Sequence, residues 1–178
     1  LLVDNFTNYH EPDAAIAACR IIDKLGYDVE FQGIFPTGRP QISKGLLDEA
    51  SAICAENIRR LKNYAEKNMP IVGLEPSEIL TLRDEYTDLC SEEDFDDATA
   101  IARNAFLFEE FMVTELSARN ESPQSESKTV HIHGHCHTKA LVGSDPLVQA
   151  FRLLGFNPVP LQTGCCGMAG SFGYERDK

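Results

Sequence analysis

The chain has 178 residues, of which 43% are hydrophobic and 25% are charged, and its formal net charge is −12. This composition is typical of a globular protein that buries a core, and no apolar run approaches the ~20 residues that a membrane span requires. The acidic excess argues against binding to nucleic acid or to an anionic membrane, because both attract basic surfaces. Six cysteines are too few for a disulfide scaffold and no signal peptide is visible, so we expect a reducing, cytoplasmic setting.

Strands and helices alternate in the first part of the chain. Residues 1–6 (LLVDNF) predict a buried strand, and Pro12 introduces a helix that stops at Gly26. The sequence YDVEFQG (27–33) alternates as a strand does, and a turn-rich loop, IFPTGRPQISKG, follows it. Helical spacing of apolar residues predicts that Cys19 belongs to the core, together with Ile16, Ile22 and Leu25.

The middle of the chain predicts further helices around a short strand. LLDEASAICAENIRRLKNYAEKN is amphipathic with Cys54 on its inner face, and the apolar PIVGLE after it predicts a strand. Pro76 and Ser77 begin the next helix. The acidic run SEEDFDD (91–97) is interpreted as the opening of a long helix over residues 97–118, because carboxylates stabilise helix N-termini.

The last third repeats the alternation after a break. RNESPQSESK is polar and serine-rich, which predicts an exposed linker over residues 119–128. TVHIHGH, DPLVQAFRLLG and NPVPLQ then predict strand, helix and strand. Alternating strands and helices are typical of βαβ units, so we expect an α/β fold with mostly parallel sheets.

The two halves of the chain align with each other. Leu25-Gly26-Tyr27 matches Leu154-Gly155-Phe156, and at the same offset Gly38 matches Gly167. The sequence therefore predicts two pseudo-symmetric, Rossmann-like βαβ repeats: residues 1–118 with a connecting helix, the linker 119–128, and residues 129–178. We expect the second repeat to be truncated at its C-terminus and the chain, which begins without methionine, to be a fragment.

The sequence QTGCCGMAGSFG places Cys165 and Cys166 among glycines, where there is little for a buried cysteine to pack against. Cys136 lies near the end of the neighbouring predicted strand, and the carboxyl ends of parallel strands are where open α/β sheets hold ligands. Thiolate sulfur suits zinc, cuprous copper and iron–sulfur clusters. We therefore expect these three cysteines to hold a metal or cluster. A redox-active thiol pair and unliganded cysteines are the alternatives.

Other candidate ligands are less specific. His135 and His137 flank Cys136 and are the best candidates among the histidines, whereas a hydrogen-bonding role is the more general expectation for any one of them. Glu78, after Pro76 and Ser77, could ligate across the pseudo-symmetry or simply stabilise a helix N-terminus.

With these residues in view, the chain resembles the cysteine-rich CCG domain family. The resemblance is carried by HGHCHTKALVG, GCCGMAGSFGYE, GRPQISKG and LEPSEILTLRDEY, and it runs through nearly the whole chain. That family includes cysteine-rich subunits of heterodisulfide reductase and of anaerobic glycerol-3-phosphate dehydrogenase, and the iron–sulfur subunit of glycolate oxidase. The motifs look most similar to the C-terminal part of large FAD-linked D-lactate dehydrogenases.

The resemblance implies a ligand set and a role. Each complete repeat of the family contributes an upstream cysteine, a Cys-Cys-Gly and a later cysteine. The upstream cysteine corresponds here to Cys136, and the Cys-Cys pair corresponds to Cys165 and Cys166. The first repeat departs from this pattern at Thr7, Pro36-Thr37 and Glu78, so it is expected to have lost its metal, and the last cysteine of the second repeat is expected beyond Lys178.

The implied cofactors are an iron–sulfur cluster or zinc in this chain and FAD in an upstream domain of the same polypeptide, which oxidises a 2-hydroxy acid and passes electrons to a quinone or cytochrome. The chain carries no dinucleotide fingerprint, so we do not expect it to oxidise lactate alone. A zinc scaffold and a thiol oxidoreductase using Cys165 and Cys166 remain alternatives.

Overall fold

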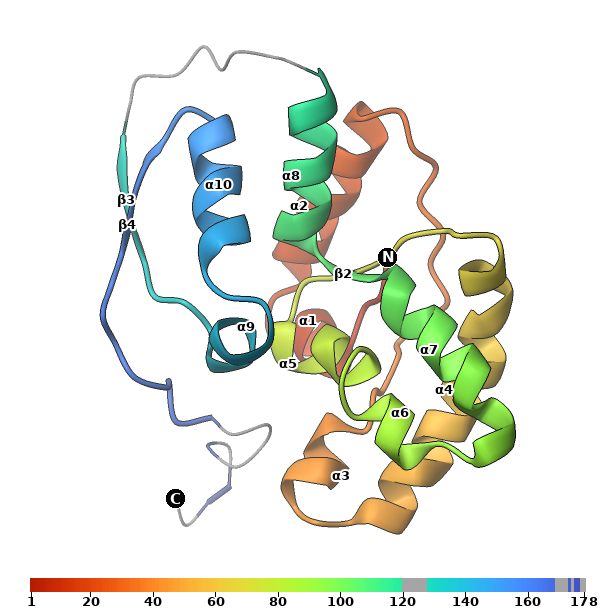
Figure 1. Cartoon of the computed structure of the whole chain (residues 1–178). Helices are drawn as coiled ribbons and strands as arrows, with labels where there is room; N and C mark the ends of the chain where they lie inside the picture. Colours follow the sequence, from red (N-terminus) through yellow and green to blue (C-terminus); the bar gives the residue numbers. More distant parts are fainter. Residues whose placement is uncertain (120–127, 169–172, 174, 177–178) are drawn as a thin grey trace. The chain divides into compact units, whose positions relative to one another are not determined.

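A computed structural model describes residues 1–119, 128–168, 173 and 175–176 of the chain (Figure 1). It divides into two compact units: unit 1 comprises Leu1–Leu107 with Met168–Lys178, and unit 2 comprises Phe108–Gly167. Most of the predicted linker, residues 120–127, lies outside the described part of the chain. Among the described residues, no helix combines the length and apolar character needed to cross a membrane.

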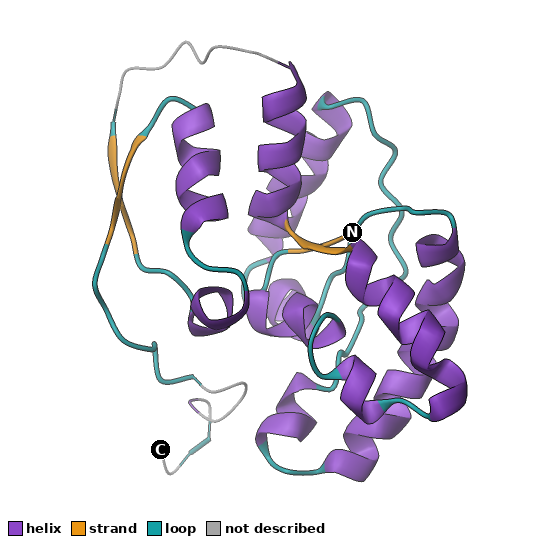
Figure 2. Cartoon of the chain, in the orientation of Figure 1, coloured by secondary structure: helices purple, strands orange, loops and turns teal. Residues whose placement is uncertain are grey.

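Short parallel pairings form the centre of unit 1 (Figure 2). Strand β1 (Ile71–Gly73) pairs in parallel with β2 (Ala105–Leu107), Leu2 bridges Gly73, and Val3 bridges Ile34. From one edge to the other the segments therefore run Ile34, Leu2–Val3, β1, β2. The chain order reverses between Leu2–Val3 and β1, which is where doubly wound sheets present their ligand crevice. The expected α/β fold with parallel pairing is confirmed.

Two local expectations were wrong. Residues 27–33 form no strand, because the hydrogen-bonded register is reached only at Ile34. The long helix predicted over residues 97–118 is interrupted by β2, whose Ala105 and Leu107 are buried against β1. Asn104 ends the preceding helix, and its side-chain amide donates to the Ala100 carbonyl at 2.9 Å.

Helices surround the pairings of unit 1. The long α4 packs on α7, and Cys54 and Ile58 are fully buried in the core as the periodicity predicts. On α2, Cys19 is only partly buried and Ile16 is 48% exposed, so that helix has a narrower core face than expected. The helices are α1 (Asn5–Tyr9), α2 (Pro12–Lys24), α3 (Arg39–Ser43), α4 (Leu47–Glu66), α5 (Pro76–Ile79), η1 (Leu80–Leu82), α6 (Tyr86–Leu89), η2 (Glu92–Asp94) and α7 (Phe95–Asn104).

The acidic run starts a helix as predicted. The Ser91 hydroxyl accepts the backbone N–H of Asp94 at 3.3 Å and begins the one-turn η2, which leads into α7. The first turn of α7 carries Asp96 and Asp97, where negative charge favours the helix dipole.

Unit 2 consists of a parallel strand pair and helices. Its elements are α8 (Phe108–Arg119), β3 (Thr129–Ile132), α9 (Cys136–Leu141), α10 (Asp145–Leu153) and β4 (Asn157–Pro160). Strand β3 pairs with β4 from Thr129↔Asn157 to Ile132↔Pro160. Helix α8 packs against α10, and its residues Phe111 and Met112 are buried. The repeat boundaries expected from the sequence, with residues 1–118 including a connecting helix, stay a prediction.

The aligned glycines adopt matching backbone conformations. Gly26 (φ +86°) and Gly155 (φ +82°) each follow the end of a helix, and Gly38 (φ +91°) and Gly167 (φ +85°) each follow the second pairing segment of their unit. Residues other than glycine rarely adopt this left-handed region. The two units therefore make the same turns at equivalent positions.

Candidate metal centre

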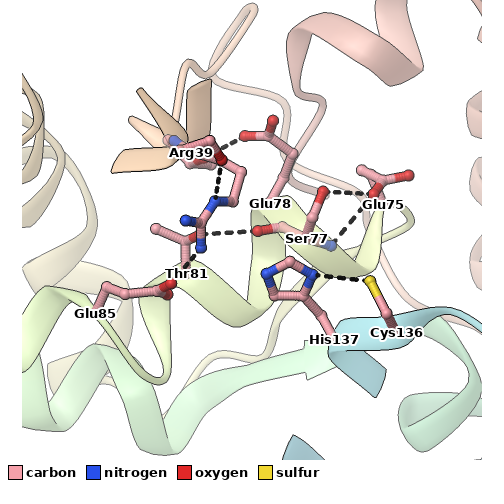
Figure 3. Close-up of polar contacts among 10 residues, drawn as sticks. Arg39, Glu75, Ser77, Glu78, Thr81, Glu85, Cys136 and His137 are labelled. Atoms are coloured by element: carbon pink, nitrogen blue, oxygen red, sulfur yellow. Dashed lines mark hydrogen bonds and ion pairs between the residues drawn. The ribbon is translucent and has the colours of Figure 1, made fainter. Parts of the chain in front are cut away.

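Cys136 begins helix α9, just beyond the carboxyl end of β3. His135 is the N-cap of this helix, and its Nδ1 accepts the backbone N–H of His137 at 3.2 Å. The Cys136 sulfur lies 3.6 Å from His137 Nδ1 (Figure 3). The ligand atoms of His135, Cys136 and His137 all lie within 4.8 Å of one another. A short turn between strand and helix thus gathers one sulfur and two imidazoles.

The second set of sulfurs follows β4 in the segment 161–167, here called the Cys-Cys loop. Cys165 and Cys166 are both exposed. The Gly167 backbone N–H donates to the Cys165 sulfur at 3.4 Å and lowers the pKa of that thiol, and hydrogen bonds with Cys136 and Cys166 lower it further. Cys136 and Cys166 thus both influence the protonation of Cys165.

Cys136 and Cys165 have opposite electrostatic characters. Burial raises the pKa of Cys136, and the adjacent Cys165 sulfur raises it further. Because the pKa of Cys165 is lowered and that of Cys136 is raised, Cys165 is the readier thiolate of the two. Thiolate is the form in which cysteine binds metal.

Two side chains hold the Cys-Cys loop against β3 and α9. His133 Nε2 donates to the Gly164 carbonyl at 3.1 Å, which agrees with the expected hydrogen-bonding role for a histidine. Lys139 Nζ donates to the Thr163 carbonyl at 2.9 Å. Sequence analysis did not single out Lys139; its only signal is its place within HGHCHTKA.

The donor set fits a thiophilic metal. The thiols of unit 2 and the imidazoles of His135 and His137 offer sulfur and nitrogen ligands, which suit zinc and iron–sulfur centres better than magnesium or calcium. No carboxylate belongs to the group of ligand atoms formed by His135, Cys136 and His137. The residues of unit 2 are therefore compatible with the cluster or zinc ion that the motifs imply.

The corresponding positions in unit 1 hold oxygen atoms. Thr7, which aligns with Cys136, is buried and donates from Oγ1 to Asp4 Oδ2 at 2.6 Å. Thr37, which aligns with Cys166, is buried and donates to the carboxylate of Glu78. Glu78 thus lies in unit 1 within a hydrogen-bonded network, and its role as a metal ligand remains a prediction. A network of hydroxyls and carboxylates fills the place where the family has sulfur.

Burial controls the protonation of Glu78. It raises the pKa of the Glu78 carboxyl to about 7; the Thr37 hydrogen bond opposes this shift, and the neighbouring carboxylate of Asp4 adds to it. The Glu78 residue is 8% exposed, so the ionised carboxylate would have little water around it, and the charged form is disfavoured. At neutral pH the carboxyl is therefore poised between its two forms.

Further buried groups, which sequence analysis missed, hold the loop around Thr37 in place. The Tyr86 hydroxyl donates to the Thr37 carbonyl at 2.9 Å and accepts from Asn57 Nδ2 at 2.7 Å. Asn57 Nδ2 also donates to the Pro36 carbonyl at 2.8 Å. Arg39 forms an ion pair with Glu85 (Figure 3). A polar residue on the inner face of an amphipathic helix, as Asn57 is on α4, is the signal that could have revealed this network.

Comparisons with known proteins found no matching family model and no significantly similar solved structure. Curated relatives do match. The D-2-hydroxyglutarate dehydrogenase of Pantoea ananatis is 31% identical over 97% of this chain, which spans only 16% of that relative. Lactate utilization protein A of Bacillus licheniformis is 25% identical over 98% of the chain and 72% of its own length. The anaerobic glycerol-3-phosphate dehydrogenase of Escherichia coli has a subunit that is 22% identical over 97% of the chain and 43% of its own length.

These relatives include the anaerobic glycerol-3-phosphate dehydrogenase, one of the enzymes that the motif resemblance had named. The resemblance to the CCG domain family is confirmed along nearly the whole chain.

Proposed function

We propose that this chain is the cysteine-rich, metal-holding part of an FAD-linked 2-hydroxy-acid dehydrogenase. Its role is to carry electrons from the flavin towards a quinone or cytochrome acceptor in the cytoplasm. The observation behind this proposal is that Cys136 follows β3 and that Cys165 and Cys166 follow β4. These two strands pair in parallel, and His133 and Lys139 hold the Cys-Cys loop. The names of the relatives support the dehydrogenase context, and they favour a 2-hydroxy acid over a substrate of another class.

Each residue has a distinct task in this proposal. Cys165 supplies the first thiolate, because its pKa is lowered. Cys136 gives up its proton when the metal arrives, and Cys166 provides the third sulfur. An iron–sulfur centre, when bound, would supply one-electron transfer. The reduced flavin carries two electrons, so it needs such a centre when its acceptor takes electrons one at a time. The FAD-binding domain of the same polypeptide is the proposed electron donor.

His135 and His137 complete the coordination or hydrogen-bond to the Cys136 sulfur, and Glu78 stays a further candidate ligand. A structural zinc site is the second candidate function. The observation that favours it is the His-Cys-His group, because zinc commonly takes mixed nitrogen and sulfur ligands.

The test is the metal content of the protein purified without air. An iron–sulfur centre predicts iron and acid-labile sulfide with visible absorbance that dithionite bleaches, whereas the zinc scaffold predicts about one zinc per chain and no reducible colour. Substituting Cys165→Ser should remove the metal. Cys90→Ser is the matched control, because Cys90 is a partly buried cysteine of unit 1 whose thiol contacts the Thr87 carbonyl. A wild-type protein free of both metals would overturn the proposal.

A further inference from the structure

The residues of the Cys-Cys loop from Gly164 to Gly167 are exposed, so burial does little to fix the position of this part of the loop. Gly164 is exposed, and a Cβ built there meets no atom within 4 Å. Cys165, Cys166 and Gly167 are exposed as well. Loops of this composition lose much conformational entropy when they are ordered, so a metal that had to order the loop would bind less tightly.

Two side chains that flank Cys136 nevertheless reach the residues immediately before Cys165. Lys139 donates to the carbonyl of Thr163 at 2.9 Å, and His133 donates to the carbonyl of Gly164 at 3.1 Å. The two carbonyls are consecutive in the chain, and their donors come from opposite sides of Cys136 in the sequence. The contacts therefore anchor the loop at the point from which the Cys165 side chain departs.

The local backbone is built to allow this reach. Lys139 lies in the last turn of α9, where its N–H donates to the His135 carbonyl at 2.9 Å. Its side chain passes close to Gly134, where an added Cβ would lie 3.0 Å from Lys139 Cε. A glycine at position 134 thus leaves room for the lysine stem, which would have to shift slightly if an alanine stood there.

We propose that His133 and Lys139 are positioning residues that hold the Cys-Cys loop so that Cys165 lies beside Cys136 before any metal binds. This inference rests on the proposed metal-holding function and assigns two residues that prepare the site for the metal. Neither residue is a ligand. Each acts through the backbone of the loop, and together they lower the ordering cost that the incoming metal would otherwise meet.

The first readout uses the metal-free protein. Under a mild diamide oxidation, the rate of forming the Cys136–Cys165 disulfide reports how often the two sulfurs meet, and peptide mapping by mass spectrometry measures it. A Cys166→Ser background removes the competing partner. Each hydrogen bond contributes about 0.5–1.5 kcal/mol net, which corresponds to about twofold to tenfold in rate for His133→Ala or Lys139→Met. The double variant should lose about tenfold or more.

Matched controls distinguish the loss of loop positioning from the mere removal of a positive charge or of a histidine side chain. His131→Ala and Lys128→Met remove the same side-chain types from unit 2, and in the described part of the chain neither of these two side chains has a hydrogen bond with the Cys-Cys loop. Lys139→Arg keeps a donor and should restore the trapping rate to within about twofold of wild type.

The second readout is the affinity of the metal-free protein for Cd²⁺. The thiolate-to-metal absorbance band measures this binding. The double variant should bind Cd²⁺ about 10- to 100-fold more weakly than wild type, the range typical of groups that orient metal ligands. Unchanged disulfide trapping in both single variants and the double variant would overturn the inference. A wild type that traps normally but binds no Cd²⁺ would instead overturn the proposed metal-holding function, and the trapping rates would still decide the role of His133 and Lys139.

Discussion

The hydroxyl of Thr37 donates a hydrogen bond to the carboxylate of Glu78, and both side chains are buried in unit 1. Thr37 aligns with Cys166 of the second repeat, and Glu78 takes the place of a cysteine in the family pattern. The family resemblance implies cysteine at both positions, so we infer that oxygen stands here in place of sulfur. What the structure shows in unit 1 is a buried hydrogen bond between these two side chains, whereas unit 2 carries thiols.

Glu78 should make the stability of unit 1 depend on pH. The pKa of its carboxyl is raised from 4.5 to about 7 in the folded chain, so folding favours the protonated form. The stability that this preference provides is complete below pH 4.5 and is lost as the pH rises through about 7. Glu78→Gln, which mimics the protonated acid, should therefore match wild type at low pH and exceed its free energy of unfolding by about 3 kcal/mol above pH 8.

Urea denaturation at a series of pH values measures this difference. Glu66→Gln serves as the control, since Glu66 is an exposed carboxylate at the end of α4. An advantage for Glu78→Gln that is the same at pH 5 and pH 8 would contradict the assigned cause.

Tyr86 should be important for the loop around Thr37. Its hydroxyl bridges the Thr37 carbonyl and Asn57, and the whole side chain is buried. Tyr86→Phe leaves these two buried groups without that partner, which should lower the free energy of unfolding by about 1–3 kcal/mol. Tyr9→Phe is the control, because Tyr9 is 68% exposed. Equal denaturation midpoints for the two variants would show that the bridge contributes nothing.

The close approach of β1 to α5 should make Gly73 intolerant of a side chain. A Cβ at this position would lie 2.5 Å from Ile79 Cβ, and both residues belong to the buried core of unit 1. Gly73→Ala should destabilise the chain by about 1–3 kcal/mol through overpacking. Ile79→Ala in the same chain keeps Cβ but removes Cγ1 and Cδ1, which would lie 2.9 and 3.2 Å from the added Cβ, and should relieve that outer part of the clash. Gly164→Ala, which meets no neighbour, is the control in thermal unfolding. Additive effects of the Gly73 and Ile79 substitutions would argue against this clash.

The thiols of the metal-free protein should differ in reactivity. The pKa of Cys165 is lowered and that of Cys136 is raised, so iodoacetamide at pH 7–8 should alkylate Cys165 first. Replacing Cys136 with alanine removes one hydrogen bond to Cys165 and should shift its alkylation profile towards higher pH. Peptide mapping of the labelled protein measures both effects. Faster labelling of Cys136 than of Cys165 would contradict the geometry of the loop.

Local sequence patterns determined much of this protein. The alternation of apolar segments predicted an α/β fold with parallel pairing, and helical spacing placed Cys54 in the core, because both depend on the period of one element. The glycine-rich CCG motif marked the candidate metal site. The aligned glycines Gly38 and Gly167 could be matched by sequence because each makes a turn that other residues rarely adopt.

Tertiary structure decided the rest. Ala105–Leu107 lies between helix-forming segments and becomes a strand only because β1 offers it an open edge. Glu78 acquires its raised pKa from burial, which no local pattern encodes. Lys139 and His133 reach Thr163 and Gly164 only because β3 and β4 pair in parallel and bring two distant loops to one end. Spacing along the chain reports the periodicity of an element, whereas burial and contacts between loops arise only when the elements pack together.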